Sequence, residues 1–183
     1  MEDNKKMVAI IKLGFWLAFI IVLVIIVKFG NNSNKDNEKR LVDINDIGNN
    51  YKYKYEIKVN DNIYNYVGSK KDNKESGYLL TNNNYLYYYK ENENTYSVLD
   101  GNLTLINNLY DGINVDLINV EHIKSIINNI NSYKNNNIIT YNVLEYQIDI
   151  IGSRDKLNIN ILYDNIEYRL EFSDINKVKE ITY

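Results

Sequence analysis

The residues that could perform chemistry in this sequence are few and spread along the chain. His122 is the only histidine, and there is no cysteine. A catalytic imidazole needs an orienting carboxylate and a nucleophile nearby. Glu121 adjoins His122, but no serine lies in a G-x-S-x-G frame. We therefore interpret His122 as a surface residue and predict that the chain is not an enzyme.

One segment begins like a calcium-binding loop, with Asp43, Asn45 and Gly48 in the expected order. Such a loop needs an oxygen donor at its fifth position and a glutamate at its twelfth. Ile47 and Lys54 occupy those positions here. The segment is therefore predicted to be a capped turn, with no metal and no cofactor.

Carboxylates could serve a glycoside hydrolase, which needs a pair of them across a cleft. Glu56, Glu167 and Glu171 instead occupy alternating positions of segments that read as strands. This pattern is typical of a solvated sheet face. An envelope hydrolase that uses an Asp/Glu pair on glycan or peptide is kept as the alternative function.

Tyrosine supplies the best binding candidate, because its ring is flat and apolar while its hydroxyl is polar. The chain holds 18 tyrosines, several of them in two short clusters. The alternative is that they fill an ordinary core and reflect the β-propensity of tyrosine. The predicted ligand surface consists of Tyr53, Tyr55, Tyr87, Tyr88 and Tyr89.

The elements that would position these side chains are mostly strands. Residues 51–59 alternate strictly between apolar and polar types, which predicts a strand with one buried face. Similar strands are expected over 157–163, 166–172 and 177–182, and a polar loop over 70–76. Isoleucines at helical spacing from Ile123 to Ile130, with Asn119 as N-cap and an end near 135–137, predict one helix. The expected fold class is α+β: an N-terminal transmembrane helix, then a mostly antiparallel curved sheet with one principal helix packed on it.

An apolar segment of about 21 residues, from Met7 to Val27, is long enough to span a bilayer. The expected organisation is a cytoplasmic tail (1–6), a transmembrane helix (7–28), a polar linker (29–50) and an extracytoplasmic β-rich domain (51–183). A cleaved signal peptide is the competing interpretation, but no small-x-small cleavage site follows the segment. The residues assigned to the anchor include Leu13, Trp16, Phe19, Leu23 and Val27.

Composition limits the partners. The chain has no proline or cysteine and is rich in residues with AT-rich codons, which favours a low-GC Gram-positive bacterium as its source. Its formal net charge of −3 opposes a nucleic-acid partner, because such a partner requires a basic face. The expected location is the cell membrane, with the polar domain outside.

The layout resembles small single-pass proteins of low-GC Gram-positive bacteria. The order of strands, helix and further strands from Tyr51 to Tyr183 resembles the half-barrels of lipoprotein-carrier (LolA-like) domains. This second resemblance implies a concave apolar face that holds a lipid or peptide. We therefore expect a membrane-tethered, non-enzymatic binding or scaffolding module of the cell envelope, with a protein, peptide or lipid as its partner.

Overall fold

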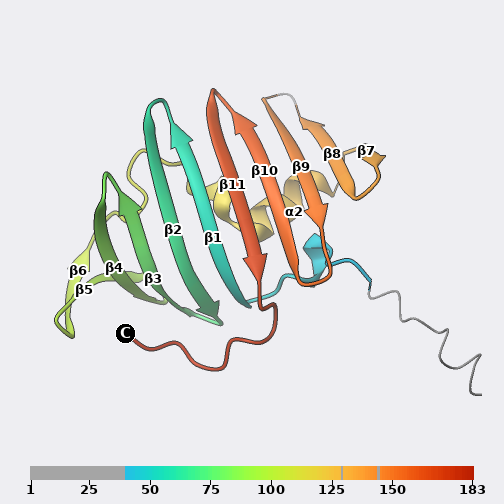
Figure 1. Cartoon of the computed structure of the whole chain (residues 1–183). Coiled ribbons are helices and arrows are strands. Elements are labelled where there is room, and N and C mark those ends of the chain that lie inside the picture. Colours follow the sequence, from blue (N-terminus) through green and yellow to red (C-terminus); the bar gives the residue numbers. More distant parts are fainter. Residues whose placement is uncertain (1–39, 129, 144) are drawn as a thin grey trace, which may run out of the picture. The chain divides into compact units, whose positions relative to one another are not determined.

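The computed structural model describes residues 40–128, 130–143 and 145–183. These residues form one antiparallel sheet of eleven strands, with the α-helix α2 (Val120–Ile127) on one face (Figure 1). Two short 3-10 helices, η1 (Ile44–Asp46) and η2 (Val115–Ile118), complete the structure. The strands are β1 (Asn50–Val59), β2 (Asn62–Lys71), β3 (Lys74–Thr81), β4 (Asn84–Glu91), β5 (Asn94–Leu99), β6 (Asn102–Ile106), β7 (Ser132–Asn135), β8 (Ile138–Val143), β9 (Tyr146–Gly152), β10 (Lys156–Tyr163) and β11 (Ile166–Ser173).

Asparagine and aspartate close most of the hairpins. The turn between β3 and β4 holds Asn82 at φ 48° and Asn83 at φ 63°, and the turn between β10 and β11 holds Asp164 at 46° and Asn165 at 61°. A two-residue hairpin turn of this kind needs positive φ at both central residues. Asn and Asp tolerate this left-handed backbone better than other residues with a side chain.

The strand order explains why the helical segments lie over the sheet. Strands β1 to β6 form one run of hairpins, β7 to β11 form another, and β1 pairs with β11 at the centre. Strands β6 and β7 therefore occupy the two opposite edges. The connection between them must cross from one edge to the other, and it carries η2 and α2 across one face (Figure 1).

The core lies between that face and the crossing connection. Tyr55, Leu170, Ile159 and Ile150 form one row across β1, β11, β10 and β9, and all four are buried. Asn119 caps α2 by accepting hydrogen bonds from the first backbone N–H groups. The apolar side of α2 packs against the sheet through Val120, Ile123 and Ile127.

The predicted α+β class is wrong. Strands make up 56% of the structure and helices only 11%, so the fold is mainly an antiparallel sheet with one helix of eight residues. In the part of the chain that the structure describes, no helix is long and apolar enough to cross a membrane. The predicted transmembrane helix and its anchor residues lie outside the described residues.

Three local predictions also differ from the structure. The helix ends at Ile127 and residues 132–135 form β7, because pairing with β8 overrides the helical spacing that continues to Ile130. Residues 70–76 belong mostly to β2 and β3, with only a tight turn between them. Residues 177–182 form no strand; Val178 instead exchanges two hydrogen bonds with the side chain of Asn50.

Candidate functional site

A charged row crosses the covered face of the sheet near one end of β1 to β4. The pairing register places Tyr51, Lys70, Glu75 and Lys90 directly opposite one another on successive strands. Directly opposite residues of an antiparallel pair point to the same face. Since Tyr51 is buried on the core face, the two lysines and the glutamate belong to that face as well.

The neighbouring row contains two glycines at positions where a Cβ atom would not fit. Gly68 and Gly77 are paired between Tyr53 on β1 and Tyr88 on β4. A Cβ atom on Gly68 would lie 2.5 Å from the hydroxyl oxygen of Tyr53, and one on Gly77 would lie 2.2 Å from the carbonyl oxygen of Val67. The missing Cβ atom of Gly68 therefore lets the Tyr53 side chain cross β2 toward β3 and β4, and that of Gly77 lets the backbones of β2 and β3 lie close together.

Tyrosine hydroxyls hold one oxygen of the Glu75 carboxylate. Tyr53 donates to Oε1 over 2.5 Å and Tyr110 donates to it over 3.3 Å. The hydroxyl of Tyr88 lies 3.5 Å from Oε1 and is also hydrogen-bonded to the hydroxyl of Tyr53. The three tyrosines come from β1, β4 and the connection after β6, so separate elements fix one carboxylate.

The other oxygen of Glu75 is left available. None of the described residues donates a hydrogen bond to Oε2. In the described part of the chain, every buried side-chain nitrogen or oxygen has a hydrogen-bond partner. Oε2 is therefore not a buried unpaired atom, and it is open to the cavity that Glu75 lines.

The tyrosine hydroxyls of this cluster are neutral donors at physiological pH. Burial raises the pKa of Tyr53, Tyr88 and Tyr110 well above 10, and the negative charge of Glu75 raises each pKa further. Burial likewise raises the pKa of Tyr55. Each hydroxyl thus keeps the proton that it donates.

A cavity of about 280 Å³ lies between this part of the sheet and the crossing connection. Its aromatic wall consists of Tyr51, Tyr53, Tyr55 and Tyr110. Charges of both signs line the cavity, so a polar ligand would find partners on several sides. The charged lining residues are Lys70, Glu75, Lys90, Asp116 and Glu121.

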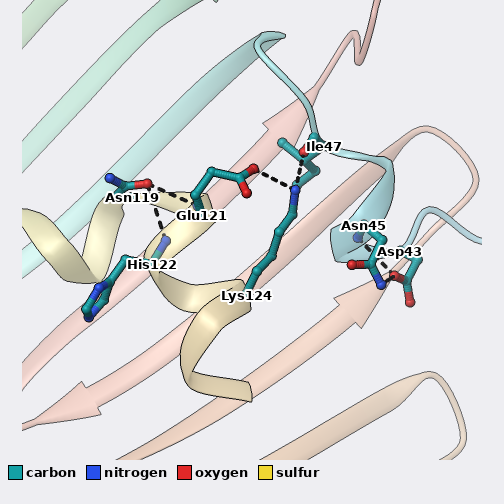
Figure 2. Close-up of polar contacts among 7 residues, drawn as sticks. All are labelled: Asp43, Asn45, Ile47, Asn119, Glu121, His122 and Lys124. Carbon is teal, nitrogen blue, oxygen red and sulfur yellow. Dashed lines mark hydrogen bonds and ion pairs between the residues drawn. The ribbon is translucent and has the colours of Figure 1, made fainter. Parts of the chain in front are cut away.

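The first turn of α2 forms part of the cavity wall, and Lys124 fixes it in place. The Nζ atom of Lys124 donates to the carbonyl oxygen of Ile47 over 2.8 Å and pairs with Glu121 over 2.7 Å (Figure 2). The side chain of His122 points away from this ion pair (Figure 2). His122 is not among the residues that line the cavity.

The five tyrosines of the predicted ligand surface do not lie together. Tyr53 and Tyr55 line the cavity, and Tyr88 is buried beside it. Tyr87 and Tyr89 point to the opposite face, because side chains alternate along β4. Tyr87 is 55% exposed there, whereas Tyr89 is covered by Tyr183, with ring centroids 5.1 Å apart.

Sequence reasoning missed four residues of the site: Lys70, Glu75, Lys90 and Tyr110. The first two fall in the segment 70–76 that was interpreted as a loop. The alternation of strands β2 and β3 is weak, because their core-facing positions include charged residues and glycines. A register based on the tight turn at Asp72 and Asn73 would have aligned Lys70 with Glu75.

The other candidates have structural partners. Asp43 caps η1 and accepts from the backbone and side chain of Asn45 (Figure 2). Glu56 and Glu167 pair with Arg169 on the open face of the sheet, and Glu171 pairs with Lys156. The described residues contain no group of three or more His, Asp or Glu side chains that could hold a metal ion.

Comparison with known proteins adds no family or fold neighbour, since the chain matches no protein-family model, no curated protein and no solved structure.

Proposed function

We propose that the chain is a membrane-tethered, non-enzymatic binding module of the bacterial cell envelope, with a small polar ligand or short peptide in the cavity beside Glu75. One observation carries the proposal. The hydroxyls of Tyr53 and Tyr110 hold one oxygen of this carboxylate, and Tyr88 supports the Tyr53 hydroxyl. None of the described residues bonds the other oxygen of Glu75, which lines the cavity. A preorganised acceptor of this kind supports ligand binding at little entropic cost.

The lining favours a polar ligand over an acyl chain. Lysine and carboxylate side chains contribute to the cavity wall together with the tyrosine rings. An acyl chain placed there would remove water from these charges without replacing its hydrogen bonds, which is unfavourable. A peptide backbone offers both donors and acceptors to the same groups.

The proposed location follows from the N-terminal sequence. The segment from Met7 to Val27 is apolar except for Lys12, and a polar stretch from Asn31 to Arg40 separates it from the sheet domain. Such a segment inserts into the hydrocarbon of a bilayer, and the polar stretch acts as a spacer. Protease added to intact protoplasts should digest the domain; complete protection would contradict the outward orientation.

The binding proposal can be tested with the full chain in detergent micelles. We would incubate it with a mixture of free amino acids and peptides of two to four residues, together with a phospholipid extract. Ligands that remain bound after gel filtration are identified by mass spectrometry. We expect peptides or amino acids to be retained by the wild-type chain.

Matched variants connect retention to the cavity. Glu75→Gln keeps a hydrogen-bond acceptor but removes the charge, and it should reduce retention at least tenfold. Glu56→Gln makes the same change on the opposite face and should bind like the wild type. Retention of phospholipid alone, or equal retention by both variants, would refute the proposal.

A hydrolase is the second candidate, because three carboxylates (Glu75, Asp116 and Glu121) line the same cavity. Hydrolysis of a glycan or peptide requires an acid and a base from such a set. If the retained compounds were shorter than those supplied, and Glu75→Gln or Glu121→Gln abolished the shortening, the hydrolase would replace the binding module.

A further inference from the structure

The cavity contains two lysines whose charge no acidic side chain balances. Among the described residues, neither Lys70 nor Lys90 forms an ion pair. On the opposite face, by contrast, Lys52, Lys156 and Arg169 each pair with a carboxylate. Lys54 and Lys58 of the open face also form no ion pair with the described residues, but they are exposed to water, whereas Lys70 and Lys90 are half-buried.

Glu75 lies between these lysines in the register but pairs with neither of them. Lys70 and Lys90 are its direct cross-strand neighbours on β2 and β4. The Nζ atom of Lys70 instead lies 6.0 Å from the centroid of the Tyr51 ring. The carboxylate uses one oxygen for the tyrosines and leaves the other open. Positive and negative groups thus line one small cavity without neutralising each other.

A ligand with only one charge would pair with either the carboxylate or the lysines and leave the other unpaired. An anion bound near the lysines would be repelled by the Glu75 carboxylate. A cation bound at Glu75 would be repelled by both lysines, whose strands lie roughly 5 Å to either side. A ligand with both charges can place its ammonium on Oε2 of Glu75, beside aromatic faces that attract cations. Its carboxylate can then accept hydrogen bonds from a lysine.

The size of the cavity limits the ligand further. Pockets for drug-sized molecules have volumes of about 300 to 1,000 Å³, so the cavity of about 280 Å³ suits a smaller compound. We infer that the ligand is a small zwitterion, an α-amino acid or a dipeptide with free ends, bound by its ammonium to Glu75 and by its carboxylate to Lys70 or Lys90, the lysines on either side of Glu75. This inference rests on the proposed binding function and specifies its ligand class.

Titration calorimetry on the full chain in micelles tests the inference with defined probes. The probes are alanine and Ala-Ala, each compared with its N-acetylated form and its C-terminal amide. Acetylation removes the positive charge and amidation removes the negative charge. Because hydrogen bonds to charged groups are the strong ones, we expect each modification to weaken binding at least tenfold.

Variants identify the partner of each charge. In Glu75→Gln the effect of acetylation should disappear while that of amidation remains. In the double variant Lys70→Gln, Lys90→Gln, the opposite result is expected. Lys58→Gln, an exposed change on the opposite face, should leave both effects intact.

The possible outcomes separate this inference from the function on which it rests. Equal affinity for capped and uncapped probes would overturn the zwitterion but leave a binding module in place. Absence of binding for every probe at 5 mM (about the weak limit of specific recognition) would also overturn it. Retention of larger peptides in the gel-filtration experiment would still support the module in that case.

Discussion

At the scale of single residues, the geometry of the site depends on a glycine as much as on its polar groups. Gly68→Ala would place a Cβ atom 2.5 Å from the Tyr53 hydroxyl oxygen and 2.6 Å from the carbonyl oxygen of Ser76. The ring must then leave its position, and overpacking of this kind costs about 1–3 kcal/mol. Urea unfolding should show that loss, whereas Gly48→Ala, with no atom within 4 Å of the new Cβ, should change the stability little.

The buried hydroxyls predict a loss of stability at high pH. The folded state raises the pKa of Tyr53, Tyr55, Tyr88 and Tyr110 above the ordinary value of 10.0, so it binds more protons than the unfolded chain at alkaline pH. The associated stability is complete below pH 10 and is lost as the pH rises above it. Each tyrosine should contribute a slope of about 1.4 kcal/mol per pH unit.

Unfolding free energies measured between pH 8 and 11.5 would test this slope. Tyr53→Phe removes one titrating group, so its stability should fall less steeply above pH 10 than that of the wild type. Tyr85→Phe alters a tyrosine that is 57% exposed and should retain the wild-type slope. A wild-type curve that is flat across this range would contradict the assignment of these phenols as buried donors.

The sequence alone predicts part of this residue-scale picture. Strict alternation identified the buried side of β1, and Tyr51, Tyr53 and Tyr55 are indeed in the core. It could not identify Glu75, because a glutamate between polar residues indicates a solvated loop as readily as a cavity wall. Only the register across three strands brings the carboxylate under the tyrosines.

At the scale of elements, Lys124 is the main polar link between α2 and the segment that precedes β1. Its side chain is 16% exposed and bonds both Ile47 and Glu121. Lys124→Met should therefore destabilise the protein by about 1–3 kcal/mol, because a charged hydrogen bond to a partly buried carbonyl is lost.

Lys156→Met is the matched control for this change. It removes an ion pair with Glu171 in which both side chains are well exposed, and such pairs contribute about 0–1 kcal/mol. Chemical denaturation of the two variants gives the comparison. Equal and small effects would show that α2 is held by its apolar side alone.

Alternation and helical spacing predict the elements better than they predict where the elements end. Asn and Asp occupy the hairpin turns, because few other residues with a side chain tolerate positive φ. The end of α2 was misplaced, since helical spacing cannot report that residues 132–135 pair with β8. Local patterns therefore indicate most strands. Long-range pairing decides whether an ambiguous segment such as 132–135 forms helix or strand.

At the scale of the whole molecule, the pairing of β1 with β11 joins the two runs of hairpins into one sheet. Leu170 lies in this central region, is 1% exposed and is paired with Tyr55. Leu170→Ala should cost about 2–5 kcal/mol, because it leaves a cavity in the core. Hydrogen exchange should show β3 and β9 losing protection together.

A control on the same scale is Leu162→Ala in β10, where the side chain is 53% exposed. This variant should keep near-wild-type protection in both runs. If Leu170→Ala exposed only β7 to β11 while β1 to β6 stayed protected, the two runs would be independent units and not one cooperative sheet.

The central pairing could not have been predicted from the sequence. Neighbouring hairpins follow from turns, but β1 and β11 are separated by more than one hundred residues and carry no local signal for each other. The α+β expectation is wrong because the helical spacing belongs to a single helix of eight residues beside a sheet of eleven strands. The position of the cavity follows from the same topology, since the connection between the two edges forms its roof.

This topology also fixes the order in which the sheet can be completed during synthesis. The strands from β1 to β6 leave the ribosome first, and β11, the central neighbour of β1, emerges after all the others. Until then, β1 presents an unpaired edge that can bind other extended chains. A nascent chain of this design therefore carries an aggregation-prone strand edge until its final strand has been made.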